Sequence, residues 1–427
     1  MAITILILFL VFLTLGIPVF ASLILSALIP FGMVEGIHAM EILAEIFYAK
    51  IANNLFASII GFVFMAEIML RTRVMVRLYD TLFSLLKRIP GSLGMTTIAF
   101  CMVFSAISGS SMATSVIVGR ISIPQMLRFN YARRFAFGTV AAGGTLGILI
   151  PPSIALIVYG IIAEVSIGAL FIAAIIPALL LVLLFSAYIF TKCAHDIQID
   201  SESDVALDTP LRIYELAAIL CLPLIIMGGI YGGIFSPNEA AFVSVFWALF
   251  IVTTGQEKFT LHDLLEAARN TAIICAKLFF IVGGAAFFAH VLVMLKLPDS
   301  MLQVLLALEI GKGTFLILVL LGILLLGMFM DGLAVTLITT PLLVPALQAF
   351  GFDLVWYGVV LVISLELSLI TPPVGLNLFL IESITDARLE EIILGVLPFI
   401  AIMLVALMIV VTVPELSLWL PSLMLGR

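Results

Sequence analysis

Charged residues are scarce in this sequence. They make up 11% of its 427 residues, less than half of the roughly 25% found in soluble domains. Hydrophobic residues make up 64%, and so few charges could not cover the surface of a water-soluble chain of this length. Apolar runs recur along the whole chain, many of them as long as the ~20 residues that a membrane-spanning helix needs. The composition therefore excludes a soluble enzyme and predicts a multi-pass membrane protein.

Other absences exclude further classes of function. Basic patches with interleaved aromatic residues are missing, so nucleic acid is not an expected ligand. The four cysteines stand singly and the four histidines do not cluster, so no transition-metal site is expected. Without a Walker motif, transport by this chain alone must use an ion gradient. The N-terminus lacks the basic flank and cleavage site of a signal peptide, which predicts a retained first helix.

Hydropathy predicts a series of membrane spans and two broken apolar segments. The spans lie at about 2–30, 52–70, 135–164, 166–191, 212–231, 235–254, 271–295, 354–381 and 392–412. The broken segments, 92–126 and 313–349, are interrupted by Ser-Gly-Ser-Ser and by Asp-Gly. Each is too short for two full spans and has a polar middle, which is typical of a re-entrant hairpin that enters and leaves the membrane on one side.

Charge and amphipathicity predict how these segments meet the membrane surface. Arginine-rich loops after the second span and after the first hairpin are expected on the cytoplasmic side. The acidic region around 31–50 is expected outside and the loop over 192–212 inside. Residues 257–270 place leucines at helical spacing opposite charges, which indicates an interfacial helix rather than a span, and 37–50 is similar.

The chain also contains an internal repeat. Pro124, Pro151, Pro152 and Pro177 recur 221 residues later as Pro345, Pro372, Pro373 and Pro398. The polar tips align at the same offset, Ser110 with Asp331. The number of predicted spans between the two hairpins is odd, which would turn the second repeat upside down. Inverted repeats with broken helices are the architecture of secondary transporters, whose site lies near the midplane where the repeats meet.

The polar interruptions are the candidate sites. The first, 104–114, combines unwound backbone with hydroxyls, which suit Na⁺, while half-helix N-termini favour an anion. The same composition also occurs at helix-packing faces. The next, 143–153, joins three glycines to a double proline and cannot remain one regular helix. A kinked span without a ligand is the alternative, although the same break recurs at 369–377.

Four acidic or basic residues fall within apolar segments. A carboxylate at membrane depth, such as Asp331, is costly and points to function, unless it reaches water or caps the following helix. Glu366 either pairs with a positive group or faces a cavity. For Glu67 and Lys277, packing or contacts between subunits are the favoured explanation.

Four motifs together carry a family resemblance. They are Ser-Gly-Ser-Ser-x-Ala-Thr from Ser108, Gly-Gly-Thr-Leu-Gly-Ile-Leu-Ile-Pro-Pro-Ser from Gly143, the Asp-Gly tip at Asp331, and Thr-Pro-Pro-Val-Gly-Leu-Asn from Thr371. In this order they resemble the large membrane subunit (M subunit, DctM-like) of tripartite ATP-independent periplasmic (TRAP) transporters. The resemblance covers essentially the whole chain.

The resemblance implies a fold, a function and partners. The fold would be all-α and membrane-integral, with two inverted repeats that each contain a re-entrant hairpin and a broken helix. Members are sodium-coupled importers in which a transport domain moves against a scaffold as an elevator. The solute, an acidic sugar such as sialic acid or a C4-dicarboxylate, would arrive on a soluble periplasmic binding protein. A small four-helix subunit (Q type) would support the scaffold in the bacterial inner membrane, as a separate polypeptide because no extra four-helix block precedes the first span.

The resemblance also divides the chain and assigns its site. The transport domain would comprise 92–165 and 313–385, the scaffold 1–91 and 166–312 with their interfacial arms, and 386–427 a last span and tail. Sodium ions are the expected cofactor. Their ligands would be Ser108, Gly109, Ser110, Ser111, Gly143, Thr145 and Gly147 in one cluster, and Asp331, Gly332, Thr371, Pro372, Gly375 and Asn377 in another. The solute would lie near Ser110, Thr114, Pro152 and Asn377.

Two alternatives stand beside the tripartite transporter. A stand-alone sodium- or proton-coupled divalent-anion symporter would share the inverted hairpins and need no binding protein, but such symporters carry Ser-Asn-Thr at both tips. A membrane-embedded enzyme would need paired catalytic groups on facing helices, which are missing, and a channel would not need two broken hairpins.

Overall fold

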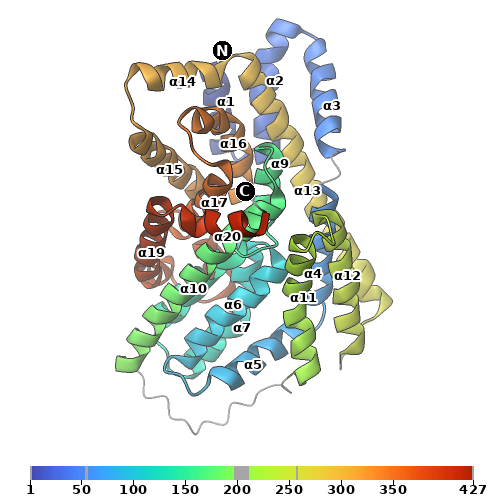
Figure 1. Ribbon diagram of the computed structural model, residues 1–427, viewed down its shortest axis with the longest axis vertical. Coiled ribbons are helices and arrows are strands. Elements are labelled where there is room, and N and C mark those ends of the chain that lie inside the picture. Colours follow the sequence, from blue (N-terminus) through green and yellow to red (C-terminus); the bar gives the residue numbers. More distant parts are fainter. Residues whose placement is uncertain (1, 53–55, 197–210, 256–257, 426–427) are drawn as a thin grey trace.

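The computed structural model describes residues 2–52, 56–196, 211–255 and 258–425, and over these ranges the chain forms helices and turns without a strand (Figure 1). Seven of the described helices are long and apolar enough to cross a bilayer, or eight if one bent pair counts as a single span. The prediction of an all-α membrane protein is confirmed.

The first half of the chain contains one helical hairpin, which is followed by a broken helix. Its elements are α1 (Ala2–Thr14), α2 (Val19–Glu35), α3 (His38–Ile51), α4 (Phe56–Leu70), α5 (Val74–Leu86), α6 (Ser92–Ser108), α7 (Ser111–Arg128), α8 (Arg133–Gly144), the 3-10 helix η1 (Thr145–Gly147), α9 (Ile154–Ile162) and α10 (Ile167–Asp196). The predicted span over 2–30 is two helices, because Gly16 takes a positive φ of 77° and is followed by Pro18.

The second half begins with three long apolar helices and ends with another hairpin and broken helix. Its elements are α11 (Ile213–Tyr231), α12 (Pro237–Thr254), α13 (Leu261–Met294), α14 (Leu297–Ala307), α15 (Lys312–Phe329), α16 (Gly332–Ala349), α17 (Leu354–Ile370), α18 (Leu376–Ile384), α19 (Leu389–Thr412) and α20 (Glu415–Leu425). Figure 1 places α4, α11, α12 and α13 together on one side, and α15, α17 and α19 on the other.

The helix order repeats along the chain at the predicted offset. In both halves a helical hairpin is followed by a helix that breaks at a Pro-Pro pair. The second helix of the hairpin begins at Ser111 in the first half and at Gly332 in the second, 221 residues further on. Both hairpins are followed by a residue with positive φ, 57° at Asn130 and 69° at Gly351. The inverted orientation of the two halves in a membrane stays a prediction.

Other helices also differ from the sequence-based expectation. α13 runs unbroken, so the interfacial helix expected at 257–270 and the span at 271–295 are one helix. Thr260 and Asp263 cap its start in a reciprocal capping box, and no proline follows within it to break it. The arginines after the second predicted span indicated a loop, but this segment forms the helix α5. The expected C-terminal tail contains the helix α20. The loop expected over 192–212 lies mostly outside the described residues.

Glycines allow the two halves to touch backbone to backbone where α8 meets α19. A Cβ atom on Gly138 would lie 2.0 Å from the carbonyl oxygen of Gly395. One on Gly395 would lie 2.0 Å from the carbonyl oxygen of Arg134. No carbon atom fits at such a distance, so both positions require glycine. Such close approach through small residues is a usual way for membrane helices to pack.

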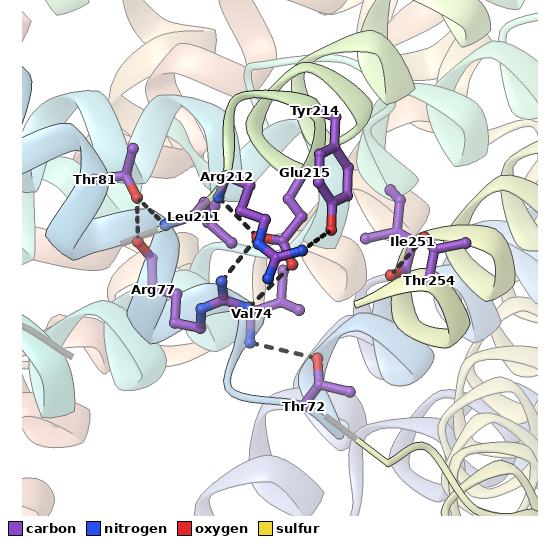
Figure 2. Close-up of polar contacts among 10 residues, drawn as sticks. All are labelled: Thr72, Val74, Arg77, Thr81, Leu211, Arg212, Tyr214, Glu215, Ile251 and Thr254. Carbon is purple, nitrogen blue, oxygen red and sulfur yellow. Dashed lines mark hydrogen bonds and ion pairs between the residues drawn. The ribbon is translucent and has the colours of Figure 1, made fainter. Parts of the chain in front are cut away.

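A buried ion pair fastens α5 to α11 (Figure 2). The Arg77 guanidinium meets both carboxylate oxygens of Glu215, with Nη2 2.8 Å from Oε2 and Nη1 3.3 Å from Oε1. Glu215 also accepts a hydrogen bond from the backbone N–H of Arg212 at 2.8 Å. Beside it, the Thr81 hydroxyl accepts one from the backbone N–H of Leu211 at 2.9 Å. α5 is therefore joined to the first turn of α11.

We expect the Arg77→Met variant to unfold at a lower temperature than the wild type, measured by thermal unfolding in detergent. The substitution leaves the Glu215 carboxylate buried without the guanidinium, and breaking such a pair costs about 3–5 kcal/mol. The double variant Arg77→Met/Glu215→Leu removes both charges and is expected to recover part of the loss. Equal losses in the single and double variants would show that the ion pair is not the cause.

Candidate transport site

A cavity of about 210 Å³ lies between the tips of the two hairpins. The first tip joins α6 to α7, and the second joins α15 to α16. The remaining walls are the break that follows α8, one face each of α4 and α13, the first residue of α9 and Leu369 near the end of α17. The first turns of α7 and α16 both line this space, so the positive ends of two helix dipoles border one cavity.

Serine and threonine hydroxyls hold the first tip together. Ser110 caps α7, with its Oγ accepting from the backbone N–H of Ala113 at 3.4 Å. The Thr114 hydroxyl donates to the carbonyl oxygen of Ser110 at 2.8 Å and lies 3.0 Å from the Ser108 hydroxyl. A Cβ on Gly109, whose φ is +59°, would lie 2.7 Å from the carbonyl oxygen of Pro152. The tip is thus packed against the first break.

Ser111 is the centre of a buried network that joins the two halves. Its Oγ lies 2.8 Å from Oε2 of Glu366 on α17 and 2.9 Å from the carbonyl oxygen of Gly144. It accepts a hydrogen bond from Nδ2 of Asn377, on α18, at 2.8 Å. The backbone N–H of Ile148 donates to Oε1 of Glu366 at 3.2 Å. These five residues are called the Ser111 hub below.

Beside the hub lie oxygen atoms of the types that could hold a sodium ion. Oδ1 of Asn377 is buried and accepts no hydrogen bond from the described residues. A Cβ on Gly147 would lie 2.5 Å from Cα of Ser111, so the unwound backbone of the first break packs directly on the tip. The Thr145 hydroxyl in this break donates to the carbonyl oxygen of Ala142 at 2.6 Å. Unwound carbonyls and an unpartnered amide oxygen are the kind of ligands that Na⁺ takes in transporters.

The second tip presents a carboxylate. Asp331 caps α16 by accepting from the backbone N–H of Leu333 at 3.3 Å, and it also lines the cavity. In the second break, the Thr371 hydroxyl donates to the carbonyl oxygen of Leu367 at 2.5 Å. A Cβ on Gly375, whose φ is +55°, would lie 3.1 Å from the carbonyl oxygens of both Leu369 and Thr371. Two carbonyl oxygens therefore converge on this glycine.

The structure groups the expected site residues differently from the motifs. Of the four expected solute contacts, Ser110 lines the cavity, whereas Thr114, Pro152 and Asn377 are buried behind the first tip. Asn377, expected with the second cluster, is hydrogen-bonded in the first. Gly143 faces α6, where a Cβ would lie 2.5 Å from Sγ of Cys101.

Pro372 is half-buried in the second break. Two further residues that the site assignment omitted, Glu366 and Glu67, contribute to the hub and to the cavity wall. Their signal in the sequence is a carboxylate within an apolar span.

Two hairpin tips that meet at one cavity in an all-helical membrane protein define a secondary transporter rather than an enzyme. The family model described as the DctM component of the tripartite ATP-independent periplasmic transporter matches residues 6–416. The chain belongs to this family, and the predicted resemblance and inner-membrane location are confirmed.

Relatives cover most of the chain. The C4-dicarboxylate TRAP transporter large permease protein DctM of Pseudomonas aeruginosa is 38% identical over 81% of each chain. The ectoine/5-hydroxyectoine TRAP transporter large permease protein UehC of Ruegeria pomeroyi is 31% identical over the full length of both. The isethionate TRAP transporter permease protein DctMQ of Oleidesulfovibrio alaskensis is 32% identical over 96% of this chain, which spans 65% of the length of that relative.

Among solved structures, the YdaH transporter of Alcanivorax borkumensis has a similar fold. The TM-score is 0.66, with 16% sequence identity over 90% of this chain and 89% of that one. At this identity the likeness concerns the fold alone.

Proposed function

We propose that this chain is the sodium-coupled permease subunit of a tripartite importer of a small organic acid. The observation that carries the proposal is the cavity between the two hairpin tips, bordered by two helix N-termini and by the oxygen-rich hub. Helix N-termini favour a carboxylate. Bound sodium would add positive charge beside them.

The proposed movement is that of an elevator. The hub ties the first hairpin, the first break, α17 and α18 into one body. The opposite wall of the cavity belongs to α4 and α13, which pack on each other and on α12 and α2. A boundary between the two groups of helices therefore runs through the cavity. Movement along this boundary would carry the solute with the hub.

The proposed partners are a soluble periplasmic binding protein, which delivers the solute, and a small four-helix membrane subunit. The name and greater length of the relative from Oleidesulfovibrio alaskensis support a permease made of two parts. The names of two relatives give C4-dicarboxylates and sialic acid as their solutes, and both of these are organic acids.

The deciding experiment is uptake of radiolabelled succinate or sialic acid into proteoliposomes that contain the chain and its small subunit. We expect uptake only with an inward sodium gradient and with the binding protein outside. Equal uptake without the binding protein would favour the stand-alone symporter instead. Uptake at full rate without sodium would overturn sodium coupling.

We expect Asp331→Asn to lower sodium-driven uptake in the same assay at least tenfold. Asparagine caps a helix as well as aspartate does, so the variant removes only the charge that faces the cavity. Asp353→Asn is the matched control, because Asp353 caps α17 from an exposed position outside the cavity. An equal effect of both substitutions would assign the loss to helix capping rather than to the cavity.

A further inference from the structure

A second pocket, of about 330 Å³, lies among α3, α9, α13 and α16. Its walls are mainly aliphatic, and its titratable side chains are Lys50 and His290, with no carboxylate beside them among the described residues. Lys50 is exposed in the last turn of α3, and His290 is half-buried on α13. Neither side chain has a hydrogen-bond or ion-pair partner within the described part of the chain. We call this space the Lys50 pocket.

One face of α13 lines both the Lys50 pocket and the cavity between the hairpin tips. Ile274 and Leu278, four residues apart, line the cavity. Residues that line the pocket continue the same stripe at helical spacing, and they are Val282, Ala285 and Ala289. The two spaces therefore follow each other along α13.

The same continuity holds on α16, which packs against α13. Leu333 lines the cavity, and Leu337, four residues further on, lines the Lys50 pocket. Pro341, after another four residues, lines the pocket as well. The cavity and the pocket are therefore two spaces along a single seam between α13 and α16.

The α16 wall of the Lys50 pocket contains backbone carbonyls that lack their usual helical donors. Pro341 and Pro345 have no N–H, so the carbonyl groups four residues earlier, at Leu337 and Pro341, cannot receive the regular helical hydrogen bond. Lipid tails could not supply a donor to such carbonyls, whereas water or a polar solute can. A hydrated pocket is therefore favoured over one filled by lipid.

We propose that the Lys50 pocket is a binding subsite on the solute route, in which the solute carboxylate lies at the Lys50 ammonium and accepts a hydrogen bond from His290. Lysine is a usual partner of carboxylates, and an imidazole has an N–H to donate in either protonation state. The region that ends with Lys50 is expected on the outer side, where the solute arrives. The inference rests on the proposed function and deepens it, because it adds a contact made before the cavity between the tips.

The first test measures the charge preference of the Lys50 pocket without a solute. Ala286 lines the pocket and is partly exposed, so Ala286→Cys places a thiol in it. In phosphatidylcholine nanodiscs that hold the chain with its small subunit, this thiol is labelled with anionic sulfonatoethyl or cationic trimethylammonioethyl methanethiosulfonate. Mass spectrometry of the peptide that contains residue 286 gives the two rates. We expect Lys50→Gln to lower the ratio of anionic to cationic labelling at least threefold, since it removes a nearby positive charge.

Lys277→Gln is the matched control, because Lys277 is an exposed lysine of α13 that lines neither space. It is expected to leave the ratio of labelling rates unchanged. Absence of labelling at residue 286, or equal ratios in the two lysine variants, would overturn the inference. Labelling that is suppressed when phosphatidylglycerol is added to the nanodiscs would identify an anionic lipid headgroup as the occupant and would also overturn it.

The second test asks whether the Lys50 pocket lies on the solute route. In sodium-driven uptake of succinate or sialic acid with the binding protein outside, Lys50→Gln is expected to raise KM at least threefold and to change the maximal rate little. Lys277→Gln should leave both unchanged. An unchanged KM in Lys50→Gln would place the pocket off the route. If the wild type took up neither acid, the proposed function would fail, and the labelling ratio alone would decide whether the pocket recognises anions.

Discussion

Replacing Gly138 with leucine is expected to abolish the monodisperse, folded protein. A Cβ at this position would lie 2.0 Å from the carbonyl oxygen of Gly395, so α8 and α19 could not keep their contact. Added bulk in a packed core costs about 1–3 kcal/mol even where side chains can move aside, and here the obstacle is backbone. The measurement is size-exclusion chromatography of detergent-solubilised protein, followed by thermal unfolding.

The control for this prediction is another glycine within an apolar helix. Gly322 lies in α15, and a Cβ there would meet no atom within 4 Å. Gly322→Leu is therefore expected to behave like the wild type, and Gly395→Leu like Gly138→Leu. If Gly138→Leu and Gly322→Leu yielded equal amounts of folded protein, the close approach of α8 and α19 would be wrong.

Ser111→Ala is expected to reduce uptake more than tenfold and to lower the unfolding temperature. The substitution removes the hydroxyl that meets Glu366, Asn377 and Gly144. A buried polar group left without its partner costs about 1–3 kcal/mol, and here more than one group is left so. Because the hub ties the two halves together, the loss should affect movement as well as stability. Proteoliposome uptake and thermal unfolding measure the two effects.

Ser115→Ala is the matched control for the hub. Ser115 lies one turn further along α7, is fully buried, and its hydroxyl has no hydrogen-bond partner among the described residues. Its removal is expected to change uptake and unfolding temperature little. Loss of uptake in both variants to the same degree would mean that burial of a serine on α7, rather than the hub, is what matters.

Local sequence features predicted the hairpins and the breaks, because glycine, proline and polar tips act within a few residues. The tips at Ser110 and Asp331 cap helices as side chains with that chemistry do. The hub could not be predicted in this way, since Ser111 and Glu366 are 255 residues apart in the chain. The same holds for the contact of Gly138 with Gly395. Periodicity indicates which face of a helix is buried, but not which helix covers it.

The charges within apolar segments show the same limit. The sequence shows Glu366 and Glu67 as acidic residues within apolar segments, but the roles of the two side chains depend on the residues that they contact in the folded chain. Glu366 bonds to a hydroxyl and a backbone amide across the repeat boundary, and Glu67 faces a cavity that only the folded chain forms. The arginines of α5 predicted a loop, whereas Arg77 is buried against Glu215. In each case a contact distant in sequence outweighs the local pattern.

The hub has a consequence for how the two halves relate to each other. At the offset of 221 residues, the position equivalent to Ser111 is Gly332 and the position equivalent to Glu366 is Thr145. A molecule made of two copies of the first half would have the serine hydroxyl at both hub positions equivalent to Ser111, and no carboxylate at either position equivalent to Glu366. A molecule made of two copies of the second half would have the glutamate at both positions equivalent to Glu366, and glycine in place of the Ser111 hydroxyl at both others. The halves are therefore complementary rather than interchangeable, and a symmetric ancestor with identical halves would have lacked this junction.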